Sequence, residues 1–226
     1  MTISVAILVY PDSDILDIAG PLGILSTSTL HDNAFSFTIL AQHELTKTCS
    51  HMRIPRDMSL DHARQDNILS SFDVLLVPGG SLEGLTGIAQ DAESAEVQFV
   101  KAFASIQLHH KKRRPRTVFS VCSGALMLAT AGVLVGKTVT THHLALDALR
   151  KQCAKHAGPE TTVVEECRYQ DGGLTENGVR VLTAAGVSAG MDAACYFIAR
   201  EFGVEQADCA ARMNEYEWED VYSLRG

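Results

Sequence analysis

Residues 117–131 read TVFSVCSGALMLATA, and this stretch predicts a strand, a tight turn and a helix in immediate succession. The largely apolar first five residues favour a buried strand. Cys122, Ser123 and Gly124 are small enough for a tight turn, and the Ala/Leu-rich residues 125–131 favour a helix. A strand that leads directly into a helix is the building unit of α/β folds with a parallel sheet.

Similar units occur along the rest of the chain. Predicted strands cover residues 3–10, 35–41, 72–77 and 137–141, and residues 162–184 hold two β-rich runs that Asp171-Gly172-Gly173 separates like a hairpin turn. Predicted helices cover residues 16–28, 93–108, 188–202 and 204–217, and another follows His143. We therefore expect an α/β fold with a mostly parallel central sheet, helices on both faces, and a single domain over residues 1–226.

Composition excludes several classes of function. The 226 residues are 46% hydrophobic and 20% charged, and 19 Lys and Arg against 27 Asp and Glu give a net charge of −8, which disfavours a nucleic-acid partner. The chain lacks a signal-peptide pattern and an apolar run of the ~18 residues that a membrane span needs. Six cysteines without a CxxC pair predict free thiols in a reducing compartment, so we expect a cytoplasmic protein with no membrane partner. The basic run 109–116 predicts a solvated loop.

A candidate nucleophile, Cys122, lies at the predicted turn between the strand and the helix of residues 117–131. Ligands of parallel α/β sheets collect at the carboxyl ends of the strands, and Asp17, Gly79-Gly80, Cys122 and His142 each follow a predicted strand. At Cys122 the helix amino terminus is expected to favour the thiolate, which is the nucleophilic form. Alternatively, Cys122 is a small buried hydrophobic residue.

The neighbours of Cys122 in this constellation each have two interpretations. Asp17 either caps the helix that follows it or passes protons between substrate and solvent. One of His142 and His143 either orients or deprotonates the site, or it makes a structural hydrogen bond. Gly79 and Gly80 either donate N–H groups to a developing oxyanion or simply turn the chain.

Several motifs together carry a resemblance to a known superfamily. They are LDIAGP (16–21), VPGG (77–80), SVCSGA (120–125), AGVL (131–134), TTH (140–142), and the run from TAAG (183–186) to Asp192. The chain resembles the ThiJ/PfpI superfamily, which is related to class I glutamine amidotransferase domains, and within it the isocyanide hydratases. The resemblance covers roughly residues 3–203.

The resemblance implies a flavodoxin-like α/β sandwich, a homodimer, and no metal or organic cofactor. It implies Cys122 as the nucleophile and Asp17 as its acid partner. Ser123 joins them as a catalytic residue, at a place where isocyanide hydratases commonly have threonine.

The resemblance also implies a set of substrate-binding residues. His143 stands where tryptophan is frequent in the isocyanide hydratases. The implied substrate-binding residues are Gly20, Gly79, Gly80, His142 and His143.

We consider three alternative functions, and in each of them a small electrophilic molecule or an oxidant reacts with Cys122. The first is hydration of an isocyanide to an N-substituted formamide. The second is a glyoxalase III or deglycase activity on 2-oxoaldehydes, with His142 as an essential base. The third is a redox sensor or chaperone-like protein in which Cys122 is oxidised. Related regulators carry an added DNA-binding module, which we do not expect in a chain that ends at Gly226.

Overall fold

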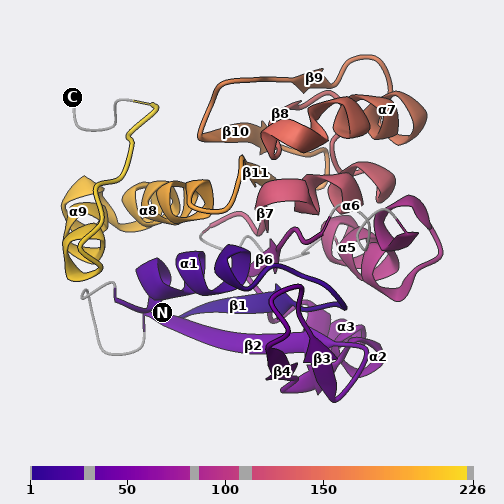
Figure 1. The fold of residues 1–226 in the computed structure, drawn as a ribbon, viewed down its shortest axis with the longest axis horizontal. Helices are drawn as coiled ribbons and strands as arrows, with labels where there is room; N and C mark the ends of the chain where they lie inside the picture. The colour runs from indigo at the N-terminus through magenta and orange to yellow at the C-terminus, as the bar shows by residue number, and fades with distance from the viewer. Residues whose placement is uncertain (1, 28–33, 82–86, 107–113, 223–226) are drawn as a thin grey trace.

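A seven-stranded sheet with the strand order β10-β11-β7-β6-β1-β2-β5 forms the centre of the computed structural model, which describes residues 2–27, 34–81, 87–106 and 114–222 (Figure 1). All neighbouring strands in this sheet are parallel except the pair β10 and β11. The strands are β1 (Ile3–Leu8), β2 (Phe35–Ala41), β5 (Met58–Ser59), β6 (Val74–Val77), β7 (Thr117–Ser120), β10 (Tyr169–Leu174) and β11 (Arg180–Ala184). The predicted α/β class and the mostly parallel sheet are confirmed.

Helices cover both faces of the sheet because successive side chains of its buried strands point to opposite sides. In β6, Leu75 and Val77 pack in one apolar cluster, while Val74 and Leu76 pack in the other. The first cluster includes residues of α2 (Leu60–Ala63), α3 (Asp66–Leu69), α5 (Ala95–Ser105), α6 (Ala125–Thr130) and α7 (Leu146–His156). The second includes residues of α1 (Ile15–Ser26), α8 (Ala189–Phe202) and α9 (Val204–Met213). None of the described helices is long and apolar enough to cross a membrane.

Four short strands lie outside the central sheet. β3 (Leu45–Lys47) pairs with β4 (Arg53–Pro55), and β8 (Thr138–Val139) pairs with β9 (Thr162–Val163). The strand predicted at residues 137–141 is therefore shorter than expected and does not join the central sheet. The 3-10 helices η1 (Cys122–Gly124) and η2 (His143–Ala145) precede α6 and α7.

The predicted hairpin exists, but its turn was placed wrongly. Asp171, Gly172 and Gly173 lie inside β10, where the pairing register with β11 shifts. The turn comes later, where the N–H of Gly178 donates to the carbonyl of Thr175. Gly172 instead allows a close approach, since a Cβ there would lie 2.9 Å from the carbonyl oxygen of Thr138.

The start of α1 differs from the expectation that Asp17 caps the helix. Asp14 is the N-cap, and its Oδ1 accepts hydrogen bonds from the N–H groups of Leu16 at 2.8 Å and Asp17 at 3.4 Å. Asp17 therefore lies in the first turn, and Pro21 lies inside the helix. The Asp17 side chain is consequently available for another role.

Only the end of the basic run 109–116 falls within the described residues, and Arg116 there is not solvated. Its guanidinium donates to the carbonyls of Leu69, Phe72 and Phe103, and it stacks 3.7 Å from the centre of the Phe103 ring. The solvated-loop prediction is wrong for this residue, because these acceptors and the ring replace its water.

Gly124 lies where the turn after β7 packs closely against the end of β6. A Cβ at Gly124 would lie 2.3 Å from the carbonyl oxygen of Val77 and 2.7 Å from that of Pro78. Since these are backbone atoms at the end of a central strand, we expect Gly124→Ala to lower the free energy of unfolding by about 1–3 kcal/mol. Chemical denaturation measures this, with Gly87→Ala as the matched control because a Cβ at Gly87 meets nothing within 4 Å. Equal stabilities of the two variants would contradict the prediction.

Candidate active site

Cys122 follows β7 directly and has a backbone conformation that few side chains adopt. Its φ of 56° lies in the left-handed region, so the surrounding structure must hold it there. The Cys122 N–H donates to the carbonyl of Ala185 at 2.8 Å, and the Cys122 carbonyl accepts from the Thr141 hydroxyl at 2.7 Å. The strand, turn and helix predicted from residues 117–131 are thus present, with the cysteine at the turn.

Gly79 brings the Asp17 carboxylate to the cysteine. Asp17 is completely buried, and its Oδ2 accepts a hydrogen bond of 2.9 Å from the N–H of Gly79. A Cβ at Gly79 would lie 2.8 Å from the Cβ of Cys122 and 2.6 Å from the N atom of Ser123. Only glycine therefore allows the chain after β6 to hold Asp17 and approach Cys122 at the same time.

Burial shifts the pKa values of both acidic groups upward. It raises the pKa of Asp17 to about 7, the charge of Asp14 adds to this rise, and the Gly79 N–H and the Cys122 thiol oppose it. Burial also raises the pKa of the Cys122 thiol to about 12, and the Asp17 charge adds to this rise. The expectation that the helix amino terminus favours the thiolate was wrong, since burial and Asp17 outweigh it.

The two groups titrate as a coupled pair, because the charge of Asp17 raises the pKa of the Cys122 thiol and the thiol hydrogen bond lowers the pKa of Asp17. One proton leaves the pair near pH 7 and the other leaves at much higher pH, so the pair still holds one proton after Asp17 has ionised. Transfer of that proton from sulfur to carboxylate would give a thiolate beside a neutral acid. The N–H and hydroxyl of Ser123 and the N–H of Val187 are the groups that stabilise this thiolate.

Ser123 and Gly80 also hydrogen-bond to each other. The Gly80 N–H lies 3.2 Å from the Ser123 hydroxyl oxygen, which in turn lies 3.3 Å from the Gly80 carbonyl. The N–H groups of Gly79 and Gly80 are therefore engaged with Asp17 and Ser123. As oxyanion donors they would have to give up these bonds, whereas the N–H of Val187 already faces the sulfur.

The remaining predicted site residues make contacts with groups other than the thiol. The Nδ1 of His142 accepts from the N–H of Leu144 at 3.2 Å, and burial together with His143 lowers the pKa of His142. His143 is exposed, and its ring centre lies 4.2 Å from that of His142. Gly20 faces α8, where a Cβ would lie 3.1 Å from the Cγ of Met191. In the described contacts, neither imidazole hydrogen-bonds to Cys122 or Asp17.

A cavity of about 490 Å³ adjoins the turn at Cys122. It includes both histidines, and its walls also include Thr141 and Ala185, which hydrogen-bond to the Cys122 backbone. Residues 140–143, 165–168 and 185–187 line it together with Leu146 and Glu219. Within the described part of the chain, no group of three or more His, Cys, Asp or Glu residues could hold a metal ion.

A comparison with known protein families finds a match over most of the chain. The sequence profile of the DJ-1/PfpI family matches residues 3–200. The chain belongs to the DJ-1/PfpI family. This confirms the resemblance to the ThiJ/PfpI superfamily and its flavodoxin-like α/β fold.

Three known proteins show how similar the chain is to others in sequence and in fold. It is 26% identical over 216 residues to the isonitrile hydratase of Pseudomonas putida, a match that covers 96% of this chain and 79% of that protein. A ThiJ/PfpI family protein from Pseudomonas syringae superposes with a TM-score of 0.73 at 26% identity, covering 99% of this chain and 78% of the other. Drosophila melanogaster DJ-1beta, at 17% identity, shares the fold with a TM-score of 0.70 over 96% of this chain and 100% of its own.

Sequence reasoning missed three residues that shape the site of this DJ-1/PfpI protein. Asp14 both caps α1 and accepts a hydrogen bond at 3.6 Å from the thiol of Cys49. Ala185 and Val187 contact Cys122 through their backbones, and Val187 has a φ of 41°. The motif TAAG at residues 183–186 was a signal for this turn, but backbone contacts leave no trace in side-chain type.

The raised pKa of Asp17 predicts a pH-dependent cost in stability. Between the ordinary value of 3.8 and about 7, the folded state binds more protons than the unfolded state, so stability falls as pH rises through this window. Each pKa unit corresponds to ~1.36 kcal/mol, so the cost reaches up to about 4 kcal/mol above pH 7. Asparagine cannot ionise and can keep the bond from Gly79. We therefore expect Asp17→Asn to gain about 2–4 kcal/mol relative to wild type between pH 4 and pH 8.

Urea denaturation of both proteins at the two pH values measures this difference. Asp61→Asn is the matched control, since Asp61 is exposed on α2. A difference between Asp17→Asn and wild type that is the same at pH 4 and pH 8 would contradict the prediction.

Proposed function

We propose that the protein is a cysteine-dependent, cofactor-independent hydro-lyase that adds water to isonitriles, also called isocyanides, and releases N-substituted formamides. The single observation that carries this proposal is the buried pair of Asp17 and Cys122, which Gly79 brings together and in which burial raises the pKa of the acid to about 7. The likeness to the Pseudomonas putida isonitrile hydratase supports the choice of substrate.

The proposed reaction begins when Asp17 takes the thiol proton and the Cys122 sulfur adds to the terminal carbon of the isonitrile. Asp17 returns the proton to that carbon, which gives a thioimidate in which carbon is bonded to hydrogen, nitrogen and sulfur. Water then adds across the carbon–nitrogen double bond, with the hydroxyl on carbon and the proton on nitrogen. The carbon–sulfur bond breaks, the hydroxyl proton passes through Asp17 to sulfur, and the formamide leaves.

Each residue of the pair suits its proposed task. A carboxyl with a pKa of about 7 can both accept and donate a proton at neutral pH, as a proton-transfer group must. The hydroxyl and N–H of Ser123 and the N–H of Val187 stabilise negative charge on sulfur. We propose the adjoining cavity as the place for the organic group of the isonitrile, with His142 and His143 in its wall.

The two other hypotheses have weaker support. A 2-oxoaldehyde reaction needs a base at the substrate carbons, and the His142 ring is turned toward η2, where it caps the N–H of Leu144. A redox sensor needs an accessible thiolate, whereas Cys122 is 8% exposed and has a raised pKa. We also propose that the protein is cytoplasmic, because its six cysteines are free thiols. We propose a homodimer from the family resemblance.

Replacement of the sulfur tests the nucleophile. We expect Cys122→Ser to lower the hydration rate of para-nitrophenyl isocyanide by more than about 10³-fold, because a serine hydroxyl in this place does not ionise. Formamide release, followed by chromatography, measures the rate, and circular dichroism checks the fold. Cys209→Ser on α9 is the matched control and should keep the wild-type rate. Turnover by Cys122→Ser at the wild-type rate would place the nucleophile elsewhere.

A second pair of variants distinguishes the two enzyme hypotheses. If Asp17 transfers the protons, Asp17→Asn should lower isonitrile turnover by ~10²–10⁴-fold, whereas His142→Asn should cost less than about tenfold. If the protein converts 2-oxoaldehydes, both variants should be equally damaging with methylglyoxal, because His142 would move the proton between carbons. Formamide and lactate are measured side by side for both substrates. Full isonitrile turnover by Asp17→Asn would overturn the role of Asp17.

A further inference from the structure

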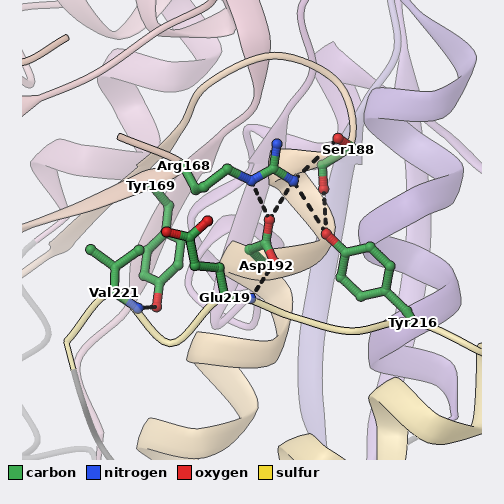
Figure 2. Close-up of polar contacts among 7 residues, drawn as sticks. All are labelled: Arg168, Tyr169, Ser188, Asp192, Tyr216, Glu219 and Val221. Carbon is green, nitrogen blue, oxygen red and sulfur yellow. Dashed lines mark hydrogen bonds and ion pairs between the residues drawn. The ribbon is translucent and has the colours of Figure 1, made fainter. Parts of the chain in front are cut away.

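A polar cluster connects residues 216–221, which we call the C-terminal segment, with the start of α8 (Figure 2). Arg168 donates from Nε to the Oδ2 of Asp192 at 2.7 Å, and its Nη2 forms an ion pair with the same oxygen at 2.5 Å. The side chain of Asp192 is 1% exposed, and its Oδ1 accepts a hydrogen bond of 2.8 Å from the N–H of Glu219. A charge buried this deeply keeps Arg168 in one orientation.

The same arginine holds both ends of the turn formed by residues 185–188. Its backbone carbonyl accepts from the N–H of Ala185 at 2.9 Å, and its Nη2 lies 3.2 Å from the hydroxyl of Ser188. The hydroxyl of Tyr216 accepts from Nη2 at 3.2 Å and lies 3.3 Å from the carbonyl oxygen of Ser188, as Figure 2 shows. The turn between β11 and α8 is therefore attached to the C-terminal segment.

The turn at residues 185–188 also contacts Cys122. The carbonyl of Ala185 accepts from the N–H of Cys122 at 2.8 Å, and the N–H of Val187 faces the sulfur. Val187 is β-branched and has a φ of 41°, a conformation that costs free energy and persists only when its neighbours hold it. Arg168 and Tyr216 supply side-chain hydrogen bonds to this turn, in addition to the backbone bonds that the N–H groups of residues 189–191 donate to the carbonyls of residues 186–188.

We propose that Arg168, Asp192 and Tyr216 are positioning residues that keep the turn at residues 185–188 in place, so that the N–H of Val187 points at the Cys122 sulfur. The C-terminal segment thereby takes part in the site without touching the reacting atoms. This inference deepens the proposed function, because it rests on Cys122 as the reacting thiol.

The other groups that act on the thiol come from different elements. Asp17 on α1 and Ser123 in η1 affect it directly, and Tyr10, which follows β1, interacts with its charge. None of them hydrogen-bonds to Tyr216 in the described structure. Removing the Tyr216 hydroxyl therefore changes the support of Val187 and leaves these groups in place.

The test measures how fast iodoacetamide labels Cys122 between pH 6 and pH 10, by mass spectrometry of the full chain after digestion. We expect Tyr216→Phe to slow labelling at pH 8 by about threefold to tenfold, which corresponds to one hydrogen bond of ordinary strength, and to shift the labelling profile to higher pH. Tyr222→Phe is the matched control, because the Tyr222 hydroxyl accepts from the N–H of Asp171 and does not contact the turn. It should label like wild type.

A profile of Tyr216→Phe that superimposes on wild type would overturn the proposal. An equal shift in Tyr222→Phe, or an equal change at Cys209 in the same digest, would show a general effect and overturn it as well. Asp192→Asn should shift the profile in the same direction, and if this variant fails to fold, Tyr216→Phe still decides. Labelling does not depend on isonitrile turnover, so a failure of the proposed function and a failure of this inference give different results.

Discussion

The approach of the chain at Gly79 and Gly80 to the turn at Cys122 is the contact on which the rest of the site depends. A Cβ at Gly79 would meet Ser123 at 2.6 Å, and one at Gly80 would meet the carbonyl oxygen of Asp12 at 2.3 Å. Because both positions lack a side chain, the end of β6 can lie between the start of α1 and the start of η1. The carboxylate of Asp17 and the sulfur of Cys122 come from elements far apart in sequence, and this approach brings them into one buried unit. Widening it by one methyl group would separate the acid from the thiol.

The same contact has an energetic consequence. Burial raises the pKa of both acidic groups, and the charge of Asp14 adds to the rise at Asp17, so the folded protein holds a carboxyl that is half ionised near neutral pH. Such a group reduces stability above that pH, and it is also able to exchange a proton there. The cost in stability and the capacity for chemistry therefore have one cause, which is the pattern expected where function opposes stability. The left-handed backbone at Cys122 and Val187 adds strain to the same place.

The sequence was sufficient for the main strands and helices and for the convergence of Asp17, Gly79 and Cys122, because strand and helix patterns are local and parallel strands end at one edge. It did not predict the short elements β3, β4, β5, α2 and α3. It was insufficient where the result depends on burial or on distant polar contacts. The thiol pKa was expected to fall and instead rises, since the helix terminus is visible in sequence and the desolvation is not. Asp14 and Asp17 are both plausible caps for α1, and only the hydrogen bonds distinguish them. Tyr216 lies 48 residues from Arg168, and nothing in its sequence context indicates that contact.

The site has two supports that act on different atoms. β1, α1 and β6 position the carboxyl, while β11, α8 and the C-terminal segment position the N–H that faces the sulfur. The two supports contact each other at Gly190 near the start of α8, where a Cβ would lie 2.9 Å from Val121 and 3.1 Å from Pro21 of α1. The first support determines where the proton is held, and the second determines how well the negative charge on sulfur is stabilised. Since a thiolate needs both a departed proton and nearby donors, neither support is sufficient alone, and Arg168 and residues 185–187 belong to the cavity wall as well as to the second support.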